Sequence, residues 1–236
     1  REDPVNGSNG GALTFRDGMF GFGGIRLFGN VYDTVNVFTL TNATVTMGAV
    51  ETVYNQNAAQ GNVRFHAVDS DITTTSHFQL HGQDTSALFE RCRVNNNGVI
   101  RLGQAANAPN KMRLVDTEWT QTREIILGRK GNQYLEIGSG SVLTVGYTSA
   151  ASESGHILVG HGSDGNGTGT LVVSNATVNV PRNIYLPQDQ RYGSQTMRVH
   201  ETGDGVTMVN CQNLYVGSTG YNGSKNVRPA TSASTL

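Results

Sequence analysis

Cysteine, charge and long apolar runs are scarce in this 236-residue chain, and each scarcity excludes a class of protein. Two cysteines cannot form the disulfide framework of a small secreted scaffold. Charged residues make up 15% of the chain and the formal net charge is −1, so no surface for nucleic acid is expected. No apolar run reaches the roughly 18 residues that a membrane helix needs, so no membrane insertion is expected.

Glycine is abundant, at 30 residues, and asparagine and threonine are frequent, a mixture that suits strands and tight turns better than helices. The chain starts with Arg1 rather than methionine, and removal of a signal peptide would explain this. We therefore expect a secreted, extracellular protein. Glycosylation sequons, which are compatible with secretion, occur at Asn6, Asn42, Asn166, Asn175 and Asn222.

A short apolar motif recurs along the chain, for example as HFQLH at 77–81, VIRLG at 99–103 and HILVG at 156–160. Its last apolar residue falls 22 to 32 residues after the preceding one. These marker residues are Leu80, Leu102, Leu127, Val159, Leu186 and Val216. A repeat of this length with three short strands and no helical period is typical of a β-solenoid. A β-sandwich is the alternative, with strands every 8–12 residues but without a repeat that keeps register.

The predicted fold is all-β: a right-handed single-stranded parallel β-helix (β-solenoid) with about seven or eight three-strand coils. Residues 1–24 are expected to form an extended N-terminal segment or cap, 25–217 the β-solenoid, and 218–236 a C-terminal tail. A neighbouring subunit is expected to hold this tail, and the alternative is that its own solenoid covers it.

Alternation along each strand separates the third run of every coil into inward and outward positions. The inward ladder is predicted to contain Phe78, Ile100, Ile125, Ile157, Ile184 and Leu214. The outward ladder contains Gln79, Arg101, Ile126, Leu158, Tyr185 and Tyr215. Its last four members form an apolar stripe that marks a binding or assembly surface if it is exposed. The alternative is that a loop of the same chain, such as 146–156 or 187–195, covers the stripe.

The stretch ILVGHGSDGNGTGTLVVSNATVNV (157–180) resembles the repeats of autotransporter-type passenger domains, in which glycine-rich turns precede "GTLxVS" and "ATVxV". LYVGSTGYNGS (214–224) resembles the start of another such repeat. The resemblance implies a secreted bacterial parallel β-helix at the cell surface, and it carries over no catalytic residue.

Candidate catalytic residues are few. GHG at 160–162 resembles the histidine motif of polygalacturonase-type hydrolases, but the other motifs of those enzymes are missing and only Asp164 lies near His161. Asp69 and Asp71 in VDSDI could hold a calcium ion in the manner of pectate lyases. Basic and acidic residues expected one coil later are Glu90, Arg91 and Arg93. Ordinary solvated turns and strand faces explain both patterns, so no catalytic residue, metal or cofactor is predicted.

Spacing excludes two other sites. His77 and His81 are four residues apart, which on a strand is about 13 Å, too far to share a zinc ion. Cys92 and Cys211 fall about four or five coils apart, roughly 20 Å along the axis, whereas a disulfide needs Cα atoms within about 7 Å. We predict that both thiols are free and mostly buried.

Both ends of such a solenoid expose strand edges, and neither terminal stretch contains an amphipathic helix that would cap them. We therefore expect a non-enzymatic extracellular structural protein whose copies assemble end to end into a filament or surface layer. The alternatives are an adhesin-like module that binds surface glycans and, third, a polysaccharide lyase or hydrolase that uses Asp69 and Asp71 or His161. The terminal residues expected to take part in assembly are Phe20, Phe22, Ile25, Leu27, Tyr221, Val227 and Leu236.

Overall fold

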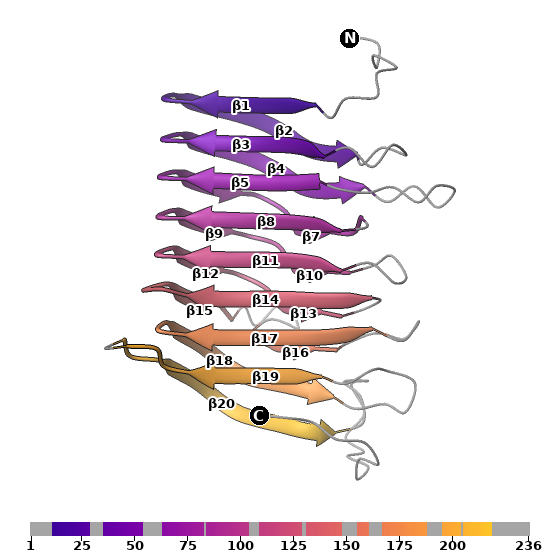
Figure 1. Cartoon of the computed structure of the whole chain (residues 1–236), viewed down its shortest axis with the longest axis vertical. Helices are drawn as coiled ribbons and strands as arrows, with labels where there is room; N and C mark the ends of the chain where they lie inside the picture. The colour runs from indigo at the N-terminus through magenta and orange to yellow at the C-terminus, as the bar shows by residue number, and fades with distance from the viewer. Residues whose placement is uncertain are drawn as a thin grey trace.

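The computed structural model describes residues 11–28, 35–53, 63–82, 84–103, 109–128, 131–147, 155–160, 167–187, 195–203 and 205–218. These residues form 20 β-strands and no helix. Every pair of neighbouring strands is parallel, and the strands lie above one another in a tall stack (Figure 1). The predicted parallel β-solenoid is therefore confirmed, and the β-sandwich is excluded. The right-handed winding stays a prediction.

The first sheet has eight strands, one from each pass of the chain. In stacking order they are β1 (Ala12–Arg16), β3 (Asn36–Thr41), β5 (Val63–Val68), β8 (Thr85–Glu90), β11 (Asn110–Val115), β14 (Asn132–Gly138), β17 (Thr168–Ser174) and β19 (Thr196–His200). Alternate residues are buried along the inner strands, as in the pattern of β5 and β8, so one side of each faces the core.

The second sheet contains two ladders joined by long strands. One ladder consists of β6 (Asp71–Thr74), β9 (Arg93–Asn96), β12 (Glu118–Gln121) and β15 (Val142–Val145). The other consists of β7 (Phe78–Leu80), β10 (Ile100–Leu102), β13 (Ile125–Leu127) and β16 (Ile157–Val159). Four long strands run through both ladders: β2 (Met19–Phe28), β4 (Thr44–Val53), β18 (Thr177–Pro187) and β20 (Met208–Ser218).

The coil count differs slightly from the prediction. Of the eight strands in the first sheet, all except the outermost β1 and β19 have neighbours on both sides, which gives about six turns rather than seven or eight. Three separate strands occur only in the turns that begin with β5, β8, β11 and β14. In the other passes the chain crosses from one ladder to the next within a single long strand.

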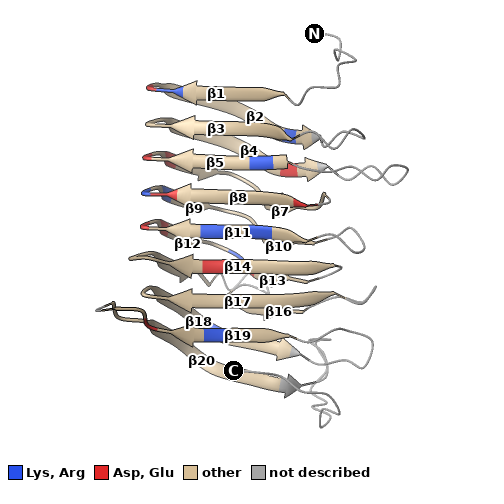
Figure 2. Cartoon of the chain, viewed as in Figure 1, with Lys and Arg blue, Asp and Glu red and all other residues tan. Residues whose placement is uncertain are grey.

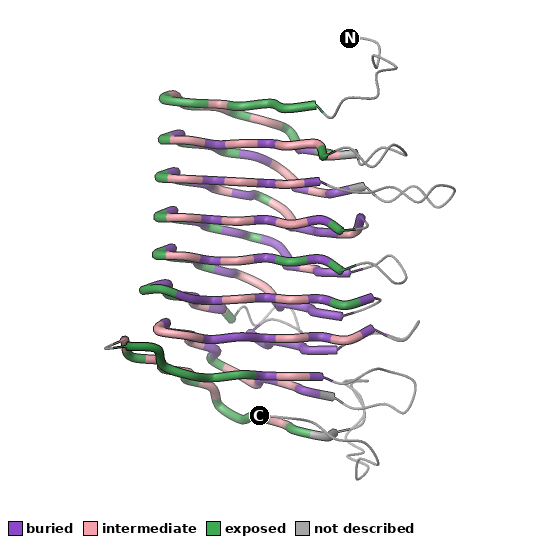
Figure 3. Tube along the Cα trace, viewed as in Figure 1, coloured by how far each residue is buried: buried purple, intermediate pink, exposed green. Residues whose placement is uncertain are grey.

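The inward ladder of the third run has the predicted register. Phe78, Ile100 and Ile125 are directly paired, and Ile157, Ile184 and Leu214 continue the series. All except Leu214 are at most 1% exposed. Stacked and edge-on aromatic rings fill the centre of the N-terminal turns, with Phe38 and Phe65 at 5.3 Å and Phe89 and Trp119 at 4.9 Å between ring centroids. One continuous core therefore runs along the axis (Figure 3).

A left-handed residue ends each first-sheet strand except β19. These residues have φ between 45° and 52° and are Asp17, Asn42, Asp69, Arg91, Asp116, Ser139 and Asn175. Asparagine and aspartate tolerate this conformation best among residues with a side chain. At Asn42 and Asn175 a small buried alanine and an outward threonine follow. Two of the sequons, Asn-Ala-Thr at 42–44 and 175–177, thus place asparagine where this corner requires a left-handed backbone conformation.

The N-terminal boundary is earlier than predicted. Residues 1–24 were expected to form an extended segment or cap, yet β1 pairs in register with β3, and β2 runs across residue 24 and pairs with β4. The first strand that the structure describes therefore starts at Ala12, within the segment predicted as a cap. The C-terminal tail, 218–236, lies outside the described residues apart from Ser218, the last residue of β20.

Candidate functional site

The acidic pair considered for calcium lies at the corner after β5 and at the start of β6. Asp69 is the left-handed corner residue after β5, and its carboxylate accepts two hydrogen bonds from the Arg91 guanidinium, at 2.7 and 3.0 Å. These hydrogen bonds and the arginine charge lower the pKa of Asp69. Asp71 is exposed on β6, in register with Arg93 of β9. Asp69 is thus ion-paired with an arginine of the next turn, and Asp71 is in register with another. In the described part of the chain no three His, Cys, Asp or Glu side chains are grouped as metal ligands.

Two of the described histidines, His66 and His77, contact carboxylates of neighbouring turns. His66 Nε2 lies 2.7 Å from Glu90 Oε2, and His77 Nε2 lies 2.6 Å from Glu51 Oε1. The hydrogen bond from His77 lowers the pKa of Glu51. The main-chain nitrogen of His81 donates to Thr52 Oγ1 at 2.7 Å. His161 and Asp164, considered for hydrolase chemistry, lie outside the described residues.

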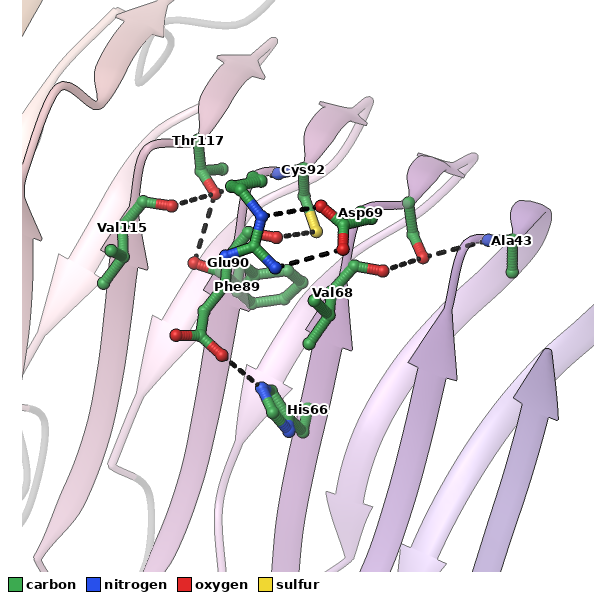
Figure 4. Close-up of polar contacts among 11 residues, drawn as sticks. Ala43, His66, Val68, Asp69, Phe89, Glu90, Cys92, Val115 and Thr117 are labelled. Carbon is green, nitrogen blue, oxygen red and sulfur yellow. Dashed lines mark hydrogen bonds and ion pairs between the residues drawn. The ribbon is translucent and has the colours of Figure 1, made fainter. Parts of the chain in front are cut away.

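The two cysteines are free, as predicted. Cys92 follows the left-handed Arg91 and is buried at the corner, where its thiol donates to the carbonyl of Glu90 at 3.3 Å (Figure 4). Burial raises the pKa of this thiol, which keeps it protonated and unreactive. The next turn has Thr117 at the same place, with its hydroxyl 3.1 Å from the carbonyl of Phe89 (Figure 4). Cys211 is partly buried on β20. Cys92 thus occupies a structural corner position that takes small side chains.

Charged residues gather in the turns after the first-sheet strands, and others lie on the outer faces of first-sheet strands, β11 and β14 among them (Figure 2). On these faces Glu136 lies 3.0 Å from the guanidinium of Arg113 and 3.7 Å from the ammonium of Lys111. Lys111 also lies over the ring of Tyr134, 4.7 Å from its centroid. These contacts connect neighbouring turns along the stack, so the charged side chains stabilise the stacking of β11 on β14.

The outer apolar stripe has the predicted register but is not an exposed surface along its length. Ile126 is 6% exposed and Leu158 is 1% exposed, and both pack with Val99. The alternative in which the chain itself covers the stripe therefore holds for these two residues. Tyr185 and Tyr215, which continue the ladder, are only partly buried.

Tyr185 and Tyr215 stack face to face, with ring centroids 4.9 Å apart and planes inclined by 7°. The separation equals the spacing between neighbouring strands, so the ring faces point along the solenoid axis. A second ladder runs beside them, in which the Asn213 side-chain amide donates to Asn183 at 2.9 Å and Asn183 donates to the Tyr185 hydroxyl at 2.8 Å. This aromatic and amide surface lies at the C-terminal side of the stack.

The N-terminal edge, formed by β1 and β2, exposes apolar side chains. Within the described residues β1 pairs only with β3 and β2 only with β4. Met19 is 85% exposed and Leu13 is 54% exposed. Three of the predicted assembly residues, Phe20, Phe22 and Leu27, are partly buried against the core, and Ile25 is buried at 8% exposure.

The C-terminal edge, formed by β19 and β20, has the same character. In the part of the chain that the structure describes, β19 pairs only with β17 and β20 only with β18. Its exposed apolar residues are Val199, Val206, Met208, Leu214 and Val216, between 36% and 69% exposed. Figure 3 shows that exposed residues gather at β1 and around β19 and β20, whereas buried and less buried residues alternate along the strands between them. The other predicted assembly residues, Tyr221, Val227 and Leu236, lie outside the described residues.

A concavity of about 490 Å³ lies at the corner beside the C-terminal edge. Asp116 and Asn175 line it together with Gly140 and Val206. Among the described residues that line it, Asp116 is the one ionisable group, so these residues do not supply the pair of carboxyl groups that glycoside hydrolysis uses.

With the solenoid and its two edges established, the chain was compared with known proteins. It matches no family model, no curated protein and no solved structure. Within the described residues no helix has the length and apolar character to cross a membrane. The parallel solenoid that the autotransporter-like stretch implies is confirmed by the strand pairing, while secretion and bacterial origin stay predictions.

Sequence reasoning missed the residues that are most exposed at the edges. Met19 and Met208 are isolated methionines in the sequence, yet both occupy the first outward position of a second-sheet strand. The corner motif could have indicated both positions. Their pairing partners, Thr44 and Thr177, each follow a corner asparagine and a buried alanine.

Proposed function

We propose that this chain is an extracellular structural protein whose copies stack end to end through the open edges of the solenoid. The observation that carries the proposal is that, within the described residues, both edges combine exposed apolar side chains with strands that pair on one side only. Unpaired edge strands are templates for pairing with another chain. Because the two edges differ, contact between them is heterologous and continues as a filament unless it closes into a ring.

The use of charge also supports a structural role. The ion pair of Asp69 with Arg91 and that of Glu136 with Arg113 each join one turn to the next. Half-exposed ion pairs of this kind add little free energy singly, but they favour the in-register arrangement of turns over shifted ones.

Sedimentation of the chain over a range of concentrations tests the proposal. We expect a mass that rises with concentration and rods in negative-stain images. Met208→Lys should weaken association by up to about tenfold: Met208 is already half-buried on the outward ladder, so the junction gains only part of the about 1.5–3 kcal/mol of a fully buried side chain, and 1.4 kcal/mol is a factor of ten. Val142→Lys is the matched control, since Val142 occupies the same outward ladder position on β15 but has neighbours on both sides.

A chain that stays monomeric at micromolar concentration would contradict end-to-end stacking. Equal effects of the Met208 and Val142 substitutions would contradict the role of the edges. Circular dichroism of each variant shows whether the strands are retained.

The surface of Tyr185 and Tyr215 favours glycan binding as a second candidate function. An aromatic ring offers an apolar face to a sugar, and the neighbouring amides of Asn183 and Asn213 offer donors and acceptors for its hydroxyls. On a glycan array, Tyr215→Ala is expected to reduce binding at least tenfold. Tyr147→Ala, at an exposed tyrosine beside Arg182, is the control and should leave binding unchanged. Absence of binding by the unaltered chain would exclude this function.

A further inference from the structure

The ladders run through the whole stack, so the register of the two edges relative to each other is defined. The first outward ladder of the second sheet contains Met19, Thr44, Asp71, Arg93, Glu118, Val142, Thr177 and Met208. Its two outermost members are therefore both methionines, and both are exposed, at 85% for Met19 and 48% for Met208.

We infer that copies join head to tail in register, with β20 of one copy against β2 of the next and β19 against β1. Met208 then lies beside Met19, and Tyr215 lies beside Arg26. This inference rests on the proposed end-to-end assembly and specifies which surfaces meet.

The long strands β2 and β20 match over nine residues without an insertion. Two residues separate the inward positions on either side of the bend in both strands, Phe22 and Ile25 in β2 and Cys211 and Leu214 in β20. In β18 three residues separate the corresponding Val180 and Ile184, and its pairing with β20 has a register shift at this point. The edge of one copy therefore fits the opposite edge more regularly than β20 fits its own neighbour.

In this register apolar residues meet apolar residues. Each core position of β20 finds a core position of β2, and Val199 of β19 finds Phe15 of β1. The β20 and β2 partners are Val209 and Phe20, Cys211 and Phe22, Leu214 and Ile25, and Val216 and Leu27. A shift of one residue would place the exposed Asn210 and Gln212 in the core, since the side-chain period of a strand is two.

Shifts of two residues are excluded by the closed contour of the solenoid. Strands in the different ladders run in different directions, so sliding one copy along one ladder displaces it sideways across the others. Only superposition in register pairs all ladders at once and buries Leu214 and Val216 together with Val199.

A cation–π contact between the two edges supports the same register. The far face of the Tyr215 ring points along the axis, away from Tyr185, and Arg26 of the next copy would lie over it. The Arg26 side chain is 71% exposed. The stack already contains this arrangement once, where Lys111 of β11 lies over Tyr134 of the neighbouring strand, 4.7 Å from the ring centroid.

Disulfide trapping tests the inference. Two variants with one added cysteine each, Met19→Cys and Met208→Cys, are made in a Cys211→Ser background, and Cys92 is kept because it is buried. Mixed under mild oxidation they should give a disulfide-linked dimer, since neighbouring strands lie about 4.8 Å apart and a disulfide accepts Cα distances of about 4.4–6.8 Å. Neither variant alone should give the dimer, because a head-to-tail contact never brings identical edges together.

The register control replaces Met208→Cys by Asn210→Cys, two residues along the same outward side of β20. Its Cα would lie about 8 Å from that of residue 19, so at least tenfold less dimer is expected. More dimer with Asn210→Cys, or dimers of Met19→Cys alone, would overturn the register. Sedimentation without cysteine substitutions separates the two failures: trapping that fails although the chain assembles overturns only the register, whereas a monomeric chain overturns the assembly as well.

Discussion

Replacement of Trp119 by alanine is expected to lower the free energy of unfolding by about 3–5 kcal/mol. The indole is 1% exposed and is among the largest fully buried side chains of the described core. Its ring packs edge-on against Phe89 at 4.9 Å and against Phe78 at 6.1 Å. Alanine removes these contacts and leaves a cavity between turns that cannot close, because the strands on either side are held at fixed spacing. Urea unfolding followed by circular dichroism measures the loss.

Two variants bracket this expectation. Trp119→Phe keeps a ring against Phe89 and Phe78 and should lose clearly less than the alanine variant. Tyr147→Ala removes a side chain that is 49% exposed and should change the free energy of unfolding by less than about 0.5 kcal/mol. If Trp119→Ala were as stable as Tyr147→Ala, the aromatic series would not be the centre of the core.

The sequence predicts the solenoid because inward residues obey two rules at once. They alternate along a strand, and they recur after each turn, so Ile100 and Ile125 are recognisable as neighbours although they are 25 residues apart. The same rules predict the free cysteines, since Cys92 and Cys211 fall in distant turns. Register in a repeated structure is thus encoded in local pattern.

The sequence does not predict what covers the outer face. Ile126 and Leu158 follow the alternation of an outward ladder, yet both are buried. Alternation reports only which side of the strand a residue occupies, and burial on the outer side depends on other segments of the chain. The stripe was therefore only partly available as a surface.

The burial of polar residues is a second feature that the sequence does not predict. Asn96 and Gln121 are at most 1% exposed and hydrogen bond to each other at 2.8 Å, and the Trp119 indole donates to Gln121 at 3.2 Å. Their positions on β9 and β12 are inward by alternation, whereas their polarity suggests the solvent side. The conflict resolves because neighbouring turns supply one another's hydrogen-bond partners, which lets polar side chains enter the core.

Gly98→Ala is expected to destabilise the fold by about 3 kcal/mol or more, because the added methyl group meets backbone. A Cβ on Gly98 would lie within 3.0 Å of the carbonyl oxygen of Ser76 and of the main-chain nitrogen of His77, and neither can move without displacing its turn. The carbonyl of Gly98 also accepts a hydrogen bond from the buried Gln121. A displacement there would therefore strain the polar ladder as well as the strand spacing.

Gly21→Ala is the control for this prediction, since nothing lies within 4 Å of the Cβ that the substitution adds and the residue is exposed on β2. Its free energy of unfolding should stay within about 0.5 kcal/mol of that of the unaltered chain. Hydrogen exchange then locates the damage: in Gly98→Ala the amides of β7 and β10 should lose protection, because Phe78 donates to Val99 across this corner. Equal stability of the two variants would mean that the turns can separate at Gly98, and the fixed spacing on which the core and the proposed junction both depend would not hold.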